Sequence, residues 1–253
     1  LMEDFYYAGG VPAMMQRISH LLNLDAETIT GKSLGENIKY SFPHNDDIIR
    51  SVDNALDPEG GLAVLKGNLA PTGAIIKPTA ASSELMVHKG RAVVFEDHDD
   101  LAARIDDPGL EVSPEDVLVM RNSGPVGAPG IPEWGFLPIP KKILATGVRD
   151  MVRLSDARMS GTAFGTVVVH VTPESANGGP LSAVRNGDII EIDVPNRKLN
   201  VLISDDEMKS RISEKIYEGP NFKRGFKWLH ARHILQADQG CDFDFLIHED
   251  LQE

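Results

Sequence analysis

The sequence of 253 residues has little cysteine, few basic residues and no long apolar run. Its single cysteine, Cys241, excludes a disulfide within the chain and any zinc or cluster site built on several of its own thiolates. No run approaches the ~18 apolar residues of a membrane span. The start, Leu1-Met-Glu-Asp4, also lacks the basic and apolar regions of a signal peptide. We therefore expect a cytoplasmic protein with no membrane partner.

The shortage of basic residues also limits the partners. With 25 Lys and Arg against 38 Asp and Glu, the formal charge of -13 disfavours attraction to nucleic acid or anionic lipid. We expect a small-molecule ligand instead. If that ligand is an anion, its site must be made positive locally, most economically by a metal ion.

The length and the 42% hydrophobic content fit one large domain, or one domain plus a fragment of another. The chain opens on Leu1 rather than Met, and residues 6–12, Tyr-Tyr-Ala-Gly-Gly-Val-Pro, read like the interior of a domain. We therefore expect a portion of a longer polypeptide.

The secondary-structure signals change near Asp57. Before it, apolar residues at helical spacing predict a helix over 11–22, and shorter helical patterns cover 25–31 and 45–50. After the turn signal Asp57-Pro-Glu-Gly-Gly61, segments rich in Val and Ile are bounded by turn residues. The expected strands are 62–65, 74–77, 92–95, 117–120, 166–171, 189–194 and 199–203, with helices at 97–105, 140–146, 204–217 and around His230 and His233. The sequence predicts an α/β protein with a mainly helical part, 1–57, and a β-barrel-like domain, 58–253.

The densest run of unusual residues is Asn122-Ser-Gly-Pro-Val-Gly-Ala-Pro-Gly-Ile-Pro-Glu-Trp-Gly135, directly after an apolar strand. Glycine and proline at this density indicate a rigid loop that lets backbone approach a ligand. Glu133 is its only ionisable residue, and a lone carboxylate on such a loop suits Mg²⁺. The alternative is a surface loop with a solvated glutamate.

A second candidate is Ser160, in the small-residue turn that precedes the strand at 166–171. A serine in such a turn can be an activated hydroxyl whose anion is stabilised by neighbouring backbone N–H groups. It can equally be ordinary turn chemistry. The Gly-x-Ser-x-Gly pattern of hydrolases is absent, because Arg158 stands two residues before Ser160.

Other candidate ligand-binding side chains are isolated in the sequence. His170 can bind substrate or take part in acid-base chemistry, or it can be a hydrogen-bonded structural group at the end of a strand. Arg158 and Lys77 are candidates to meet an anion. His230 and His233 have no partner at metal-site spacing, so we interpret both as structural.

Several motifs, in order along the chain, carry a family resemblance. They are Gly67-Asn-Leu-Ala-Pro71, Gly73-Ala-Ile-Ile-Lys77, Gly124-Pro-Val-Gly-Ala-Pro-Gly-Ile-Pro-Glu133, Ser155-Asp-Ala-Arg-Met-Ser-Gly161, His170-Val-Thr-Pro-Glu174, Gly178-Gly-Pro180, Asn186-Gly-Asp-Ile-Ile190 and Pro195-Asn-Arg197. Together they resemble the family of dihydroxy-acid, phosphogluconate and pentonate dehydratases, over most of the chain.

The resemblance implies a two-domain enzyme. The N-terminal domain would supply the cysteines of an iron-sulfur cluster, 2Fe-2S rather than 4Fe-4S, and most Mg²⁺ ligands. The C-terminal domain would be a swivelling β/β/α fold. The family's Arg-x-Ser-Gly serine falls on Ser160 as the catalytic alkoxide base, and its Pro-Gly-x-Pro-Glu glutamate falls on Glu133 as a Mg²⁺ ligand. Thr162, Arg158 and His170 would contact the substrate, and this chain would hold no cluster ligand and be inactive alone.

Departures from the pattern bear on the substrate. The branched-chain enzymes carry a glycine-rich Asp-Gly-Arg-Phe-Ser-Gly-Gly run, whereas this chain reads Asp156-Ala-Arg-Met-Ser-Gly-Thr162. Ala157, Thr162 and Trp134 resemble the sugar-acid branch, so an aldonate such as L-arabinonate is favoured over a branched-chain precursor. Two other readings stay open: a ligand-binding module that lost catalysis, and a hydratase that uses Mg²⁺ without a cluster. The family also implies a homo-oligomer, a dimer or a tetramer.

Overall fold

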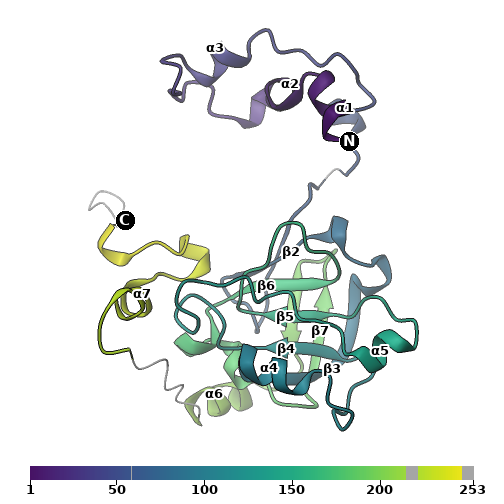
Figure 1. The fold of residues 1–253 in the computed structure, drawn as a ribbon, viewed down its shortest axis with the longest axis vertical. Coiled ribbons are helices and arrows are strands. Elements are labelled where there is room, and N and C mark those ends of the chain that lie inside the picture. The colour runs from purple at the N-terminus through teal and green to yellow at the C-terminus, as the bar shows by residue number, and fades with distance from the viewer. Residues whose placement is uncertain (58, 215–221, 247–253) are drawn as a thin grey trace. The chain divides into compact units, whose positions relative to one another are not determined.

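The computed structural model describes residues 1–57, 59–214 and 222–246. The chain divides into two compact units, Leu1–Gly60 and Gly61–Glu253 (Figure 1). The assignment of residues 1–57 to the end of a cluster-bearing domain stays a prediction.

The first unit is helical around a small apolar core. Its elements are α1 Met2–Tyr7, α2 Gly10–Arg17, α3 Leu34–Ile38 and the 3-10 turns Ser19–Leu21 and Val52–Asn54. Phe5 packs against buried Ala8, Ala13 and Ile49. The helix expected over 11–22 is confirmed in its first part, where α2 lies.

The helix expected over 25–31 is wrong. Glu27 and Ser33 form an isolated bridge, and the Thr28 backbone N–H donates to the Lys32 carbonyl over 3.0 Å. The Thr28 and Thr30 hydroxyls bond each other and the Asn37 side chain. Side chains of this type compete with the helical hydrogen bonds and favour a turn. The short helix begins later, at α3, where Ser33 and Glu36 form a capping box.

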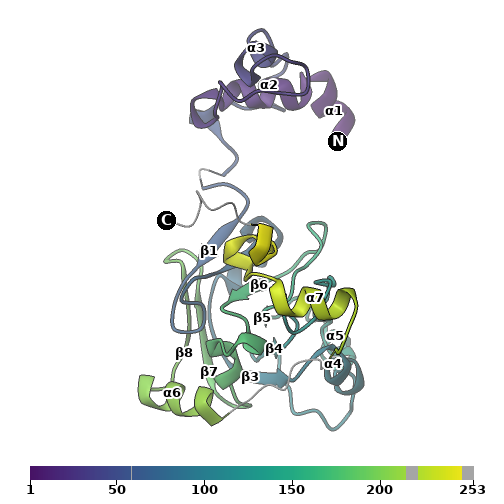
Figure 2. The ribbon, with the colours of Figure 1, turned by 90° about the vertical axis from the view of Figure 1, so that its left-hand side faces the viewer.

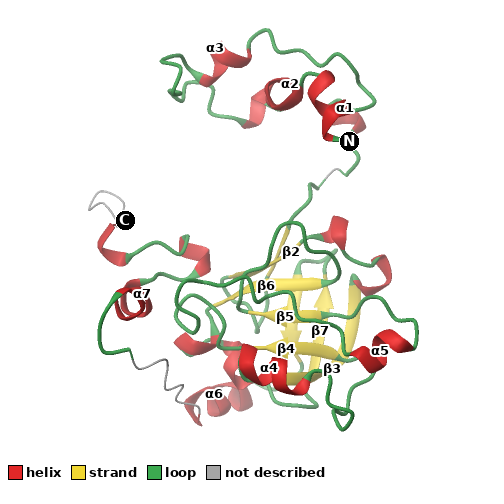
Figure 3. Ribbon diagram, in the orientation of Figure 1, coloured by secondary structure: helices red, strands yellow, loops and turns green. Residues whose placement is uncertain are grey.

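Within its described residues, the second unit contains eight strands in one sheet, which Figure 3 shows in yellow. They are β1 Ala63–Leu65, β2 Gly73–Ile76, β3 Val87–Phe95, β4 Val117–Met120, β5 Arg153–Ser155, β6 Val167–Thr172, β7 Ile189–Asp193 and β8 Lys198–Val201. Their order across the sheet is β1-β2-β6-β5-β4-β3-β7-β8. The central neighbours β3, β4, β5 and β6 are parallel, and the outer pairs are antiparallel.

The sheet curls until its first and last strands meet. Lys66, directly after β1, forms a bridge with Lys198 of β8 and exchanges backbone hydrogen bonds with Arg197 and Leu199 at 2.9 and 3.0 Å. The sheet is therefore nearly closed, and the barrel-like part of the predicted fold is confirmed. The swivelling description stays a prediction.

The alternation of side chains along the strands produces two cores. Val117 and Val119 of β4 and Leu154 of β5 face the interior of the curled sheet. Buried residues from all the remaining strands of the sheet pack there with them. Leu118 and Met120 face outward and are covered by α4 and α5 through Leu101 and Ile143. Strand β4 therefore has no exposed face and reads as a continuous apolar run.

In the part of the second unit that the structure describes, the helices are short. They are α4 His98–Arg104, α5 Lys141–Ala145, α6 Asp205–Glu214 and α7 Phe226–His233, with 3-10 turns at Pro78–Ala80, Ser83–Leu85, Ser175–Asn177, Pro180–Ala183, Ala237–Gln239 and Asp244–Leu246. Figure 2 shows α6 near the ends of β7 and β8, and its Met208 joins the inner core. The helices predicted at 97–105 and 140–146 are confirmed as α4 and α5. The last residues of the helix expected over 204–217 lie outside the described residues.

Truncation of a residue inside the sheet tests this arrangement. Leu154 of β5 is fully buried in the inner core, so Leu154→Ala should lower the free energy of unfolding by ~2–5 kcal/mol. Leu202 is 50% exposed, so Leu202→Ala should change it by less than about 1 kcal/mol. Urea denaturation followed by circular dichroism measures both. Equal losses for the two variants would contradict the assignment of the core.

Candidate active site

The two loops singled out in the sequence leave neighbouring parallel strands. Residues 121–140 follow β4, and residues 156–166 connect β5 to β6. Carboxyl ends of parallel strands meet at the same edge of a sheet. Accordingly, Asp156, directly after β5, accepts hydrogen bonds from the backbone N–H groups of Asn122 and Ser123 over 3.2 and 2.9 Å. The predicted loops therefore start side by side.

The loop at 122–135 is held by a second buried carboxylate. Glu174, after β6, accepts hydrogen bonds from the backbone N–H groups of Val126 and Gly127, over 2.8 and 3.0 Å. Asn122 and Ile131 have φ of 57° and 47°, a region that a β-branched residue such as Ile131 rarely adopts. Such strain persists only where the surroundings hold the backbone in place, and it is concentrated at functional loops.

Gly135 joins this loop to the Ser160 loop. Its N–H donates to the Arg158 carbonyl over 2.8 Å. A Cβ at this position would lie 2.7 Å from that same oxygen, so the close approach requires glycine. Next along the chain, the rings of Phe136 and Phe164 lie 6.1 Å apart. The two loops are thus tied together on both sides of Ser160.

The C-terminal segment supports the same loop from the other side. The Gln236 side chain donates to Glu174 over 2.7 Å and accepts from the Glu174 backbone N–H over 2.8 Å. His230 of α7 is buried, and its Nε2 accepts from the Gly130 N–H over 3.3 Å. His233 pairs with Asp244 at 2.9 Å. In the described residues, His230 and His233 therefore make structural contacts, with Gly130 and Asp244.

Glu133 lies on the exposed side of its loop, where its carboxylate is 3.9 Å from the Arg158 guanidinium. Each of the two side chains is about half exposed, so the pair is a weak one. Trp134, the next residue, stacks on His98 with ring centroids 4.4 Å apart. Within the described ranges, no group of three or more His, Cys, Asp or Glu side chains could hold a metal ion. Glu133 can therefore offer a single carboxylate to a cation whose other ligands come from elsewhere.

Ser160 is partly exposed in the turn between β5 and β6. Its Oγ lies 3.0 Å from the Thr162 hydroxyl and accepts from the Thr162 N–H over 3.4 Å. The Ala163 N–H donates to the Ser160 carbonyl over 3.1 Å, which fixes the turn. Across the part of the chain that the structure describes, no histidine or carboxylate hydrogen-bonds to Ser160. The geometry offers donors to an anion at Oγ but no base that would remove its proton.

His170 lies in β6, where its backbone has a φ of 54° and its N–H donates to the Ala157 carbonyl over 3.0 Å. Burial, and then the charge of Arg158, lower the pKa of His170, so its ring is neutral near pH 7. Its side chain lines a mainly apolar cleft of about 440 Å³ together with Thr72 and Cys241. A neutral imidazole beside this cleft can donate or accept a hydrogen bond.

The structure thus divides the predicted site residues into two groups. Glu133, Arg158 and His170 are linked through Arg158, and Ser160 and Thr162 are linked through their hydroxyls. In the described residues, no side-chain hydrogen bond or ion pair joins the two groups. The backbone bond from the Gly135 N–H to the Arg158 carbonyl ties the Glu133 loop to the loop that carries Ser160.

Sequence reasoning missed the residues that build the site. Asp156 and Glu174 stand inside the family motifs, yet nothing local shows that they are buried and bonded to backbone N–H groups. Gln236 is distant in sequence and has no visible signal, and His230, which the sequence analysis interpreted as structural, gives no hint of its bond to the Gly130 N–H. One feature of the sequence pointed to Asp156: it lies a few residues before Ser160 in the turn that contains the Ser-Gly pair.

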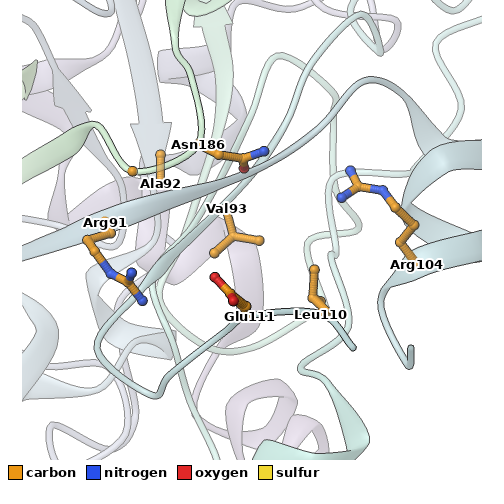
Figure 4. A pocket seen from close by; sticks show the side chains of 8 residues that line it. Arg91, Ala92, Val93, Arg104, Leu110, Glu111 and Asn186 are labelled. Carbon is orange, nitrogen blue, oxygen red and sulfur yellow. The ribbon is translucent and has the colours of Figure 1, made fainter. Parts of the chain in front are cut away.

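The second hollow, of about 300 Å³, is not a candidate anion site (Figure 4). Arg91 and Arg104 line it, and Figure 4 shows Glu111 and Asn186 between them. Arg91 pairs with Asp116 at 3.0 Å and Arg104 pairs with Asp100 at 2.5 Å. Both guanidinium groups are therefore already neutralised by carboxylates.

Fold and site together define a mixed α/β domain that presents a serine and a lone carboxylate on two joined loops. Residues 47–241 match the family described as dihydroxy-acid/6-phosphogluconate dehydratase C-terminal. The match covers most of the chain, so the chain belongs to this dehydratase family and contains its C-terminal domain.

Curated relatives agree. Over 97% of its length the chain is 50% identical to a 6-deoxy-6-sulfo-D-gluconate dehydratase of Pseudomonas putida and to an L-arabinonate dehydratase of Rhizobium leguminosarum. It is 41% identical over 95% of its length to a dihydroxy-acid dehydratase of Acetivibrio thermocellus. The chain spans 43% of the length of each of these relatives. The resemblance to the family is confirmed.

No described helix is both long and apolar enough to cross a membrane.

Asp156 gives the site a measurable pH dependence. Burial, and then the charge of Glu174, raise the pKa of Asp156 to about 7, against the opposing effect of the backbone N–H bonds. Between about pH 4 and pH 7 the folded chain therefore holds a proton that the unfolded chain has released, so its free energy of unfolding falls as pH rises. The slope should be on the order of 1 kcal/mol per pH unit and should level off above the raised pKa.

Asp156→Asn should flatten this slope, because an amide does not titrate. It should also lower stability overall, since the amide NH₂ would face backbone N–H donors. Asp99→Asn, which replaces a fully exposed carboxylate on α4, is the matched control. Denaturation at a series of pH values measures the slopes. A slope that persists unchanged in Asp156→Asn would show that another group carries it.

Proposed function

We propose that this chain is the C-terminal part of a dehydratase that converts a sugar acid, an aldonate, into a 2-keto-3-deoxy acid. The observation that carries the proposal is Ser160, whose partly exposed Oγ meets the N–H and hydroxyl of Thr162 on a loop tied to the Glu133 loop. Family membership supports dehydration as the reaction class.

In the proposed reaction, Ser160 as alkoxide takes the C2 proton of the substrate, the C2–H electron pair forms the C2–C3 double bond, and the C3–O bond breaks. The departing hydroxide combines with the proton held by Ser160 to form water, which regenerates the alkoxide. The resulting enol tautomerises to the keto acid. The two donors of Thr162 stabilise the negative charge on Oγ before the proton is taken. A serine hydroxyl is too weak an acid to form this alkoxide without nearby positive charge. The base therefore depends on cations around the turn.

Glu133 is suited to be one ligand of a Mg²⁺ ion, because it is an exposed carboxylate on a rigid loop beside the serine loop. When bound, Mg²⁺ supplies charge that favours ionised oxygen atoms of the substrate. This chain contributes the Glu133 oxygen, and Arg158, 3.9 Å away, must yield that oxygen to the metal.

The iron-sulfur cluster, 2Fe-2S in our proposal, does not fit this chain, whose single thiol is Cys241. Burial raises the pKa of that thiol, which disfavours the thiolate that binds iron. The proposal therefore assigns the cluster to the N-terminal domain of the same polypeptide, and this chain alone would be inactive. None of the proton-transfer steps proposed for Ser160 depends on the cluster.

The proposed substrate follows from the residues around the serine. Thr162, Arg158 and His170 would contact the sugar acid, with Arg158 available to its carboxylate. The higher identity to two sugar-acid dehydratases than to the dihydroxy-acid enzyme supports an aldonate. The second candidate substrate is a dihydroxy acid of branched-chain synthesis. Its support is the 41% identity of the chain to a dihydroxy-acid dehydratase. We propose a cytoplasmic homo-oligomer, a dimer or a tetramer, as the full enzyme.

The proposed base is tested by Ser160→Ala in the full-length polypeptide, purified without oxygen. Turnover of a panel of aldonates and dihydroxy acids should fall by at least about 100-fold, because the proton acceptor is gone. Ser83→Ala removes an exposed hydroxyl from a 3-10 turn and should keep normal turnover. Full activity of Ser160→Ala would refute the assignment.

The proposed metal ligand is tested by Glu133→Gln in the same protein. Loss of a carboxylate ligand should weaken Mg²⁺ binding by more than the roughly 10-fold expected for an outer partner of a ligand. Calorimetric titration with Mg²⁺ measures the dissociation constant, and Glu84→Gln, an exposed glutamate, is the control. Unchanged Mg²⁺ affinity in Glu133→Gln would exclude the residue from the site.

A further inference from the structure

We propose that Lys77 is a positioning residue that polarises the peptide group between Gly161 and Thr162 and so favours negative charge on the Ser160 hydroxyl. This inference rests on the proposed function of Ser160 as the base. In this proposal Lys77 is a cation of this chain that acts on the Ser160 alkoxide through a single peptide group, which both of them contact.

The geometry is a relay across a single amide. The Lys77 ammonium donates to the Gly161 carbonyl over 2.9 Å. The same peptide group carries the Thr162 N–H, which donates to the Ser160 Oγ over 3.4 Å. The lysine and the serine oxygen therefore lie on opposite sides of one amide, one on its acceptor and one on its donor.

The physical effect follows from the amide dipole. A positive charge on the carbonyl oxygen draws electron density toward it and makes the N–H of the same group a stronger donor. Hydrogen bonds in which one partner is ionised are also shorter and stronger than neutral ones. An alkoxide at Ser160 gains from the stronger N–H more than the neutral hydroxyl does, so the relay favours deprotonation.

Strand pairing places Lys77 where it can act. Ile76, the last residue of β2, pairs with Val168 near the start of β6, and the Ser160 loop leads into that start. The Gly165 N–H donates to the Ala80 carbonyl over 2.6 Å. Residues 77–80 therefore run beside the end of the serine loop, and the Lys77 side chain reaches back along it.

The other charged groups around the turn are already engaged. Asp150 accepts from the Thr166 hydroxyl over 2.7 Å and pairs with buried Arg153 at 2.8 Å. Arg158 donates from its Nε to the Ile131 carbonyl and pairs weakly with Glu133. In the described residues, Lys77 has no carboxylate within the 4.0 Å of an ion pair, so nothing there cancels its effect on the turn.

The experiment uses the full-length polypeptide with Lys77→Met, which removes the charge, and Lys77→Arg, which keeps it. Lys142→Met is the matched control, because Lys142 also donates to a backbone carbonyl, that of Pro108 over 3.2 Å, away from the serine loop. Circular dichroism checks that each variant folds. Profiles of kcat and KM against pH are measured for all three, with Ser160→Ala beside them.

In Lys77→Met, the acidic limb of the kcat profile should move upward by about one pH unit, which lowers kcat about 10-fold below that limb at nearly constant KM. Lys77→Arg should restore most of the loss, and Lys142→Met should match the unsubstituted enzyme. A Lys77→Met profile that coincides with that of Lys142→Met would overturn the proposal, as would a lower kcat without any shift of the limb.

A second readout does not depend on turnover. In protein labelled with ¹⁵N-threonine, the Thr162 amide proton should move upfield in Lys77→Met and stay in place in Lys142→Met, because its N–H loses polarisation. If Lys77→Met fails to fold, Lys77→Gln takes its place in both measurements. An unmoved Thr162 signal overturns the relay. Full activity of Ser160→Ala would instead refute the proposed base, while the amide signal would still test the contact of Lys77.

Discussion

Two buried carboxylates, Asp156 and Glu174, determine the form of this site. They accept hydrogen bonds from backbone N–H groups of the loop at 122–135, and Asp156 also accepts from Ser175. A loop so rich in glycine and proline has few hydrogen bonds of its own, so these acceptors hold it against the sheet. Burying them close together is costly, and the raised pKa of both groups is the sign of that cost.

Because buried acceptors hold the loops on the side that faces the sheet, the side that faces solvent is free to contact a ligand. Glu133, Ser160 and Thr162 are all at least partly exposed, while the residues that hold them are buried. The domain thus presents acceptors and a hydroxyl on a rigid base and provides few cations near them. Lys77 contacts the serine loop at the Gly161 carbonyl, and Arg158 faces Glu133. Arg153 also reaches both loops, at the Leu137 and Phe164 carbonyls, but it is buried and paired with Asp150. The remaining charge of the proposed reaction has to come from outside this chain.

The sequence allowed prediction of what depends on local pattern. Apolar runs such as Val117–Met120 became strands, and glycine-rich turns became the site loops. Arg153–Ser155 was missed as a strand, because three residues beginning with a fully buried arginine resemble a loop. Lys77 was noted as a candidate cation, yet its contact with Gly161 depends on the pairing of β2 with β6, which no local pattern reveals. The local sequence pattern does not predict which strands pair or in which register, so it cannot predict contacts between distant residues.

The stacking of Trp134 on His98 has a practical consequence. The indole is the residue next to Glu133, and its ring lies nearly parallel to the imidazole, at 20°. Contact with an imidazole alters the emission of an indole, so the emission of Trp134 depends on whether this stack is intact. The Glu133 loop therefore carries an intrinsic optical probe of its own conformation, one residue from the proposed ligand.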